Sequence, residues 1–140
     1  MLIVTPNFHF SGHCRQAIEL YKKAFGAQVA ELLYNSDADP RDYVNQDPSR
    51  KDLVYHAEIY IGRQRIMMTD SPVGASPGGN LLSLVVTFET AEDVKSAYAV
   101  MADGAEIIRS MTRTTYSSCF VSLIDKFGMR WELMTEQAEE

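Results

Sequence analysis

The chain has 140 residues and a mass of 15.7 kDa, and 46% of its residues are hydrophobic and 23% charged, a composition that excludes intrinsic disorder. This length fits one domain, or two small halves that share a core. The 13 basic and 19 acidic residues give a formal net charge of −6. Such a charge repels phosphate backbones and anionic lipid, so we expect neither nucleic acid nor a membrane as a partner.

The sequence predicts a reduced, cytoplasmic protein. Its apolar stretches are far too short to cross a bilayer, and residues 1–6 lack the features of a signal peptide. The two cysteines, Cys14 and Cys119, do not make a disulfide framework. Both lie at apolar positions of their segments, so we expect inert core thiols.

The first half of the chain predicts the order strand, helix, strand, strand, strand. Residues 2–10 alternate polar and apolar side chains, as a half-buried strand does. Apolar residues then recur at helical spacing, with Ser11 as the expected N-cap and Gly26 as the residue that ends the helix. Residues 35–52 are rich in Asp, Pro, Asn and Ser and predict a long mobile loop. Further strands are predicted at residues 28–34, 55–61 and 65–69.

The second half predicts the same order again. Residues 71–79, with the sequence SPVGASPGG, predict a linker before it. A strand at residues 81–88 leads into a helix that begins after Thr90 as N-cap and ends at Gly104. The remaining strands are predicted at residues 105–109, 116–124 and 130–134.

The two halves also match in sequence. AFGAQV at residues 24–29 recurs as ADGAEI at residues 102–107, which indicates an internal duplication. Each half alone leaves one face of its sheet bare, so we expect two sheets that cover each other. The predicted fold class is α+β, with a single domain over residues 1–140 that consists of modules 1–70 and 80–140.

Three stretches carry a resemblance to a known family: FHFSGHCRQAIELYKKAFGA at residues 8–27, HAEIYIG at residues 56–62 and DKFGMRW at residues 125–131. Together they resemble PhnB-like proteins of the glyoxalase/bleomycin resistance/dioxygenase superfamily, also called the vicinal oxygen chelate superfamily. This resemblance implies two βαβββ modules in the glyoxalase/bleomycin-resistance arrangement, a cup-shaped cavity between the sheets, and a homodimer.

The resemblance also identifies where a metal ion would bind. Metal-dependent members place a ligand on the first and last strand of each module, usually His or Gln and then Glu. Only one of the four matching positions here offers a ligand for a divalent ion, so we expect no metal at this place and no other cofactor. These positions are Thr5, Met67, Ser83 and Glu132.

Strand alternation independently predicts which side chains line the cavity. If the apolar residues of each strand pack beneath the helices, the opposite face carries polar, aromatic and hydroxyl groups. Such a lining suits a small organic ligand with several hydrogen-bonding groups. The predicted ligand-binding residues are Thr5, Asn7, His9, Tyr60, Met67, Ser83, Ser118, Phe120 and Ser122.

Three residues are candidates for catalysis. His56 and Glu58 are two apart on a strand and point the same way. They pair as a base and its orienting group, or capture a displaced metal ion with Glu132, or form a solvated hydrogen-bonded pair. Glu132 itself serves as a general base if the cavity raises its pKa with no cation near, or it is a vestigial ligand bonded to Ser83 or Arg130.

The sequence therefore favours a protein that binds a small polar organic molecule in the inter-sheet cavity without the superfamily's metal. The alternative is a lyase, isomerase or transferase of the superfamily that uses Glu132 with His56 and Glu58, metal-assisted or not. A second alternative is a non-catalytic module that binds a partner through residues 35–52.

Overall fold

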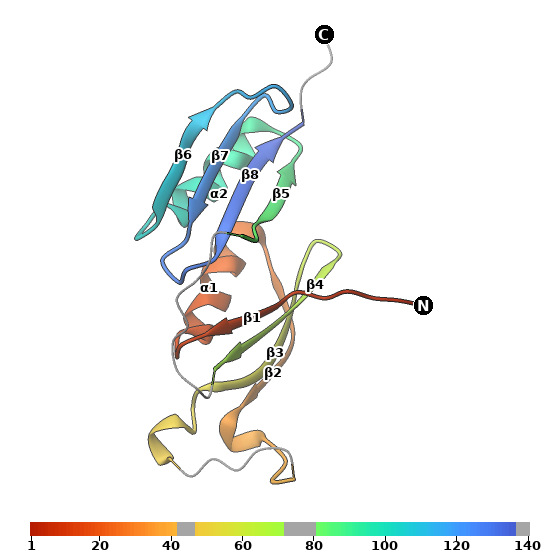
Figure 1. The fold of residues 1–140 in the computed structure, drawn as a ribbon, viewed down its shortest axis with the longest axis vertical. Helices are drawn as coiled ribbons and strands as arrows, with labels where there is room; N and C mark the ends of the chain where they lie inside the picture. The colour runs from red at the N-terminus through yellow and green to blue at the C-terminus, as the bar shows by residue number, and fades with distance from the viewer. Residues whose placement is uncertain (42–46, 72–80, 137–140) are drawn as a thin grey trace. The chain divides into compact units, whose positions relative to one another are not determined.

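The chain divides into two compact units, Met1–Ser76 and Pro77–Glu140. The computed structural model describes residues 1–41, 47–71 and 81–136. Within these residues each unit contains one α-helix and one four-stranded sheet (Figure 1). Neither helix is long and apolar enough to cross a membrane.

The first unit has the order strand, helix, strand, strand, strand. Its sheet runs β1-β4-β3-β2, in which β1 and β4 are parallel and the other pairs antiparallel. Helix α1 packs on β3 and β4. The elements are β1 (Asn7–Phe10), α1 (Cys14–Phe25), β2 (Gln28–Tyr34), β3 (Val54–Ile61) and β4 (Gln64–Asp70).

All but the first residue of the linker predicted at residues 71–79 lies outside the described residues. The second unit repeats the topology of the first, because its sheet runs β5-β8-β7-β6 with β5 parallel to β8. Helix α2 packs on β8 and β5. This repeated topology confirms the predicted α+β fold of two βαβββ modules. The elements are β5 (Leu84–Phe88), α2 (Ala91–Met101), β6 (Glu106–Thr112), β7 (Phe120–Ile124) and β8 (Arg130–Thr135).

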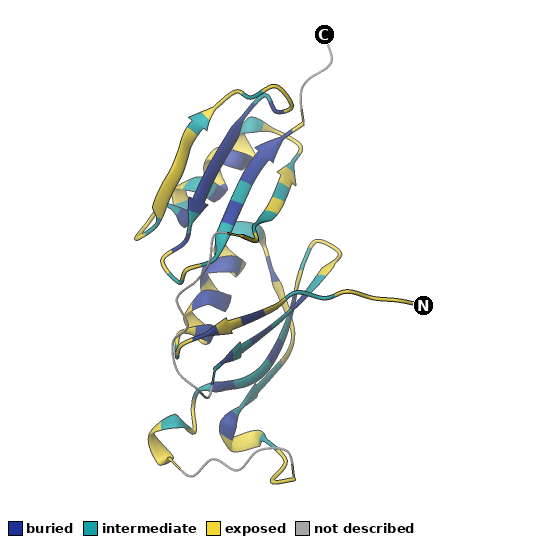
Figure 2. Cartoon of the chain, in the orientation of Figure 1, coloured by how far each residue is buried: buried dark blue, intermediate teal, exposed yellow. Residues whose placement is uncertain are grey.

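The core of each unit lies between its helix and one face of its sheet. In β1, Phe8 and Phe10 are buried, and the Phe8 ring meets that of Tyr21 edge to face at 6.4 Å between centroids. In the second unit Trp131 and Leu133 are fully buried. Figure 2 shows buried positions concentrated on β7, β8 and one side of each helix. The opposite side of each sheet is here called its helix-free face.

Helix α1 begins differently from the prediction. Ser11 is not its N-cap, because the helix starts only at Cys14. The carboxylate of Asp70, at the end of β4, accepts hydrogen bonds from the backbone N–H groups of Gly12 at 2.9 Å and Cys14 at 3.0 Å. Its other oxygen accepts from the N–H of Val54 at 2.9 Å. A buried acid from a distant strand thus satisfies the free donors of the helix start.

The loop predicted at residues 35–52 contains two short 3₁₀ turns, η1 (Asn35–Asp37) and η2 (Pro48–Arg50). The buried side chain of Asn35 donates from Nδ2 to the carbonyl of Arg50 at 2.9 Å, which joins the two turns at the base of the loop. Residues 42–46, in the middle of this loop, lie outside the described residues, so its mobility stays a prediction.

Both cysteines are free and buried, as predicted. Burial raises the pKa of the Cys14 thiol, and the charge of Asp70 raises it further. We expect Ellman's reagent to react with the thiols of the native protein at least about 1,000-fold more slowly than with those of the unfolded chain, because reaction requires opening of the fold. Absorbance of the released thiolate, with and without guanidinium, measures both rates. Rapid native-state labelling of Cys14 would contradict this burial.

Candidate functional site

The helix-free face of the first sheet brings together most of the residues predicted for this module. The register aligns Asn7 with Met67 and Met67 with Glu58, so these side chains share one face. Thr5 precedes β1 and is partly buried. The predicted residues that the strands place on this face are Asn7, His9, His56, Glu58, Tyr60 and Met67.

Glu58 is the centre of a charged network on this face. His56 Nε2 lies 2.9 Å from Glu58 Oε2, and Arg65 Nε donates to Glu58 Oε1 at 2.6 Å. The Glu58 side chain is only 14% exposed. Hydrogen bonds from His56 and then Arg65 lower the pKa of Glu58, so it is a carboxylate at neutral pH. His56 and Glu58 therefore pair as predicted, while a catalytic role for them stays a prediction.

Sequence reasoning missed Glu31, which belongs to the same cluster. Simple alternation from Val29 along β2 places Glu31 on the helix side of the sheet. A bulge between Val29 and Glu31 shifts the register, so that Glu31 pairs with Glu58 and joins its face. Ligand atoms of Glu31, His56 and Glu58 lie within 4.8 Å of one another. No turn residue or motif in β2 marks this bulge in advance.

The helix-free face of the second sheet contains Glu132. The register aligns Val85, Glu132, Ser122 and Arg109 across the four strands. Arg130 Nη2 lies 3.5 Å from Glu132 Oε1. Of the alternatives that the sequence left open for Glu132, the geometry matches the carboxylate bonded to Arg130.

Three other predicted residues of this module lie in different environments. Ser122 is 3% exposed, and its Oγ has no hydrogen-bond partner among the described residues. Phe120 is buried, with the guanidinium carbon of Arg109 5.9 Å from its ring centroid. Ser83 lies just before β5 and is partly exposed. A buried hydroxyl without a partner is rare, so Ser122 is an exception among the buried polar side chains described here.

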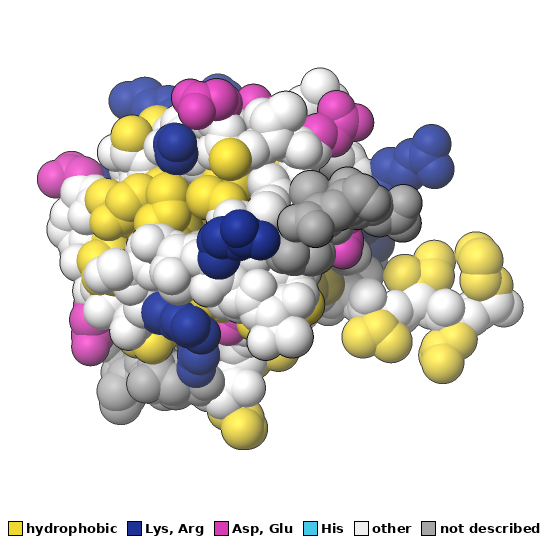
Figure 3. Space-filling model, turned by 90° about the horizontal axis from the view of Figure 1, so that it is seen from above, with side chains coloured by type: hydrophobic (Ala, Val, Ile, Leu, Met, Phe, Trp, Pro, Cys, Tyr) yellow, Lys and Arg dark blue, Asp and Glu magenta, His cyan; other side chains and the backbone are white. Residues whose placement is uncertain are grey.

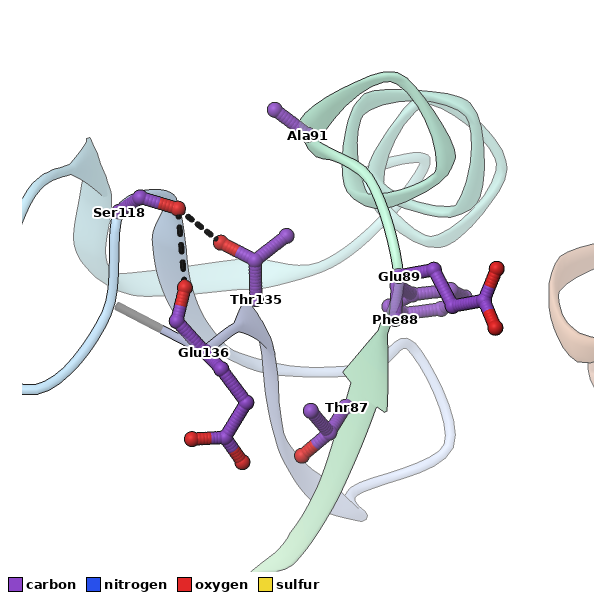
Figure 4. Close-up of a pocket in the computed structure, with 7 residues that line it drawn as sticks. All are labelled: Thr87, Phe88, Glu89, Ala91, Ser118, Thr135 and Glu136. Carbon is purple, nitrogen blue, oxygen red and sulfur yellow. Dashed lines mark hydrogen bonds between the residues drawn. The ribbon is translucent and has the colours of Figure 1, made fainter. Parts of the chain in front are cut away.

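Ser118 lies in a separate pocket of about 390 Å³ at the carboxyl ends of β5 and β8 (Figure 4). Its Oγ is 2.5 Å from Thr135 Oγ1 and donates to the carbonyl of Glu136 at 3.1 Å. These bonds already satisfy the hydroxyl and join the start of β7 to the end of β8. The pocket is lined by Thr87, Phe88, Glu89, Ala91, Ser118, Thr135 and Glu136.

Two βαβββ modules of equal strand order define a duplicated glyoxalase-type protein. The sequence model of the Glyoxalase/Bleomycin resistance protein/Dioxygenase superfamily matches residues 8–133. The chain therefore belongs to this superfamily.

Relatives with assigned names or solved structures agree with this membership. The chain is 26% identical over 137 residues to Protein YjdN of Escherichia coli (strain K12), covering 91% of each. It is similar to the crystal structure of PA1353 from Pseudomonas aeruginosa, with a TM-score of 0.82, 22% identity, and coverage of 99% of this chain and 100% of that one. It is also similar to the structure of a PhnB protein from Bacillus cereus, described as a putative 3-demethylubiquinone-9 3-methyltransferase. The TM-score is 0.76 and the identity 24%, with coverage of 96% of this chain and 99% of that one. The two solved structures share the fold of this chain, in agreement with the fold that the sequence resemblance predicts.

Proposed function

We propose that this protein binds a small polar organic molecule on the helix-free faces of its sheets, without a metal ion at the superfamily's ligand positions. The observation that carries this proposal is the buried Ser122 Oγ, which has no hydrogen-bond partner among the described residues and lies in register with Glu132. Leaving such a hydroxyl unpaired costs about 1–3 kcal/mol, so a polar group of a ligand would be held there. Tyr60 and Asn7 add hydrogen-bonding groups on the first sheet.

The donor chemistry supports a metal-independent site. Thr5, Met67 and Ser83 match three of the superfamily's four ligand positions, and none of them supplies an imidazole or carboxylate. The fourth, Glu132, lies in an ion pair with Arg130. One carboxylate shared with a guanidinium is a poor holder of a divalent ion.

A thermal-shift screen of chelator-treated protein against polar metabolites and antibiotics tests the proposal. A compound present at 100 times its dissociation constant stabilises the native state by about 2.7 kcal/mol, a shift of several degrees. Ser122→Ala is expected to diminish that shift and to stabilise the unliganded protein by about 1–3 kcal/mol, because it removes the cost of an unpaired buried hydroxyl. The absence of any stabilising compound, or a full shift in Ser122→Ala, would count against the proposal.

Ser117→Ala is the matched control for this screen. Ser117 is also fully buried on the same segment, but its Oγ donates to the carbonyl of Cys119 at 2.8 Å. Its replacement is expected to lower stability by about 1 kcal/mol and to leave the ligand-induced shift unchanged.

The pair of His56 and Glu58 favours a second candidate function, that of a lyase, isomerase or transferase of the superfamily. A carboxylate bonded to an imidazole orients the ring and supports its action as a general base. Arg65 holds that carboxylate in place. Turnover of a compound found in the screen, lost in His56→Gln, would establish this function. A part for Glu132 in such a reaction stays a prediction.

We also propose a homodimer. Figure 3 shows apolar side chains at the surface, which support association with a second copy. Cytoplasmic location and binding of a protein partner through residues 35–52 stay predictions. The most exposed large apolar residues are Met1, Leu2, Ile3, Val4, Leu81 and Leu82.

A further inference from the structure

The cluster of Glu31, His56 and Glu58 is made by a register shift and not by neighbours in sequence. Strands β2 and β3 are antiparallel, and the bulge before Glu31 places it directly opposite Glu58. His56 lies two residues along β3, on the same face. One ligand atom from each of the three side chains falls within 4.8 Å of the other two.

The charges in this cluster are not balanced by the protein itself. Two carboxylates directly opposite each other on neighbouring strands repel. Arg65 pairs with Glu58, whereas Glu31 has no cationic partner among the described residues. Counted apart from the imidazole, the two carboxylates and one guanidinium leave a net charge of −1. Binding of a cation among these side chains would explain why the bulge holds two carboxylates so close together.

We propose that Glu31, His56 and Glu58 form a binding site for a divalent transition-metal ion of the Zn²⁺ class. An imidazole nitrogen and two carboxylate oxygens are a donor set that such ions prefer, and three protein ligands leave a coordination position open for water or a substrate oxygen. The site lies on β2 and β3, whereas the superfamily's two positions in this module are Thr5, just before β1, and Met67, on β4 beside Glu58. It is therefore a different metal site from the one whose ligands the chain lacks.

The hydrogen bonds already present in this cluster are compatible with the binding of a metal ion. The ion would take the place of the bond between His56 Nε2 and Glu58 Oε2, atoms now 2.9 Å apart. Arg65 keeps its bond to Glu58 Oε1 and continues to orient the carboxylate, as groups that hydrogen-bond to metal ligands do. Glu31 is exposed on the outermost strand of the sheet, so it supplies the third ligand without repacking of the core.

Titration of the chelator-treated full chain with Co²⁺ and Zn²⁺ tests the site. We expect one ion per chain, visible d–d absorption of the bound Co²⁺, and its displacement by Zn²⁺ measured by calorimetry. Glu31→Gln and His56→Gln are each expected to lower the association constant by about tenfold or more. Circular dichroism of each variant confirms that it is folded. Because Glu31 is exposed, we expect Glu31→Gln to disturb the fold less than His56→Gln does.

Two matched variants locate the ion. His9→Gln removes another imidazole from the same face, and Glu132→Gln removes the carboxylate at the superfamily's position; both are expected to bind the metal as the parent does. Loss of binding in Glu132→Gln, undiminished binding in both Glu31→Gln and His56→Gln, or no binding of Co²⁺ at all would overturn the proposal. The ligand screen uses chelator-treated protein, and the metal titration contains no organic compound. Each experiment therefore tests one proposal independently of the other.

Discussion

Replacement of Asp70 by Ala is expected to lower the free energy of unfolding by about 4 kcal/mol. Asp70 is only 6% exposed, and its two oxygens accept three backbone hydrogen bonds, from Gly12, Cys14 and Val54. Removal of the carboxylate leaves three N–H groups without their acceptor, each at a cost of about 1–3 kcal/mol before relaxation. The same carboxylate lies at the start of α1, where its negative charge interacts favourably with the positive end of the helix dipole. One side chain thus joins β4, α1 and β3.

Urea unfolding followed by far-ultraviolet circular dichroism measures this loss. Asp70→Asn keeps one acceptor oxygen and the shape of the side chain, so it is expected to lose about half as much. Asp39→Ala is the control for removal of an acid in this unit, because Asp39 is exposed and pairs only with its neighbour Arg41; its effect is expected within about 0.5 kcal/mol. Equal stability of the parent and Asp70→Ala would show that water replaces the carboxylate.

The sequence predicts most of the fold because the signals involved are local. Alternation and helical spacing extend over a few residues, and they locate β2 with the bounds found in the structure. The first strand is the main exception, since it was predicted from residue 2 and begins at Asn7. Pro6 has no N–H to donate to β4, so the ladder of hydrogen bonds cannot continue beyond it. The Pro6 carbonyl still accepts from the N–H of Met67 at 2.9 Å.

The candidate site is predicted only where it depends on spacing within one strand. His56 and Glu58 are two apart on β3, and alternation alone puts them on one face. Glu31 depends on a bulge, and Arg65 depends on the pairing of β3 with β4, neither of which local spacing reveals. Alternation likewise places Ser122 on the right face, but only the packing around it shows that its hydroxyl lacks a partner.

Long-range contacts also limit how well the sequence predicts which residues stabilise the fold. Ser11 has the residue type and position of an N-cap, yet the helix start is satisfied by Asp70, which is far away in sequence. A cap that comes from another strand requires knowledge of the sheet, and no property of residues 11–14 indicates it. Asp125 in the second unit differs from Asp70, because the donors to its carboxylate lie only two to six residues away, at Phe127, Met129 and Trp131.

Asp125→Ala is expected to lower the free energy of unfolding by about 3 kcal/mol. Asp125 is 3% exposed and follows β7. Its Oδ1 accepts from the N–H groups of Phe127 at 2.9 Å and Met129 at 3.1 Å, and its Oδ2 accepts from Trp131 Nε1 at 2.9 Å. The carboxylate therefore fixes the turn between β7 and β8 and also pairs the indole N–H at the centre of the core, where an unpaired donor is costly.

A double-mutant cycle separates these two roles. Trp131→Phe removes the indole donor but leaves the turn bonds, and Asp125→Asn leaves an acceptor for the turn in place of the charge. If the charged bond to the indole contributes as such bonds usually do, the coupling energy between the two positions is about 1.5–3 kcal/mol. Because Trp131 is the only tryptophan, unfolding of all four proteins must be followed by circular dichroism and not by fluorescence. Strictly additive losses would mean that Asp125 acts through the turn alone, and that burial of the Trp131 ring needs no acceptor.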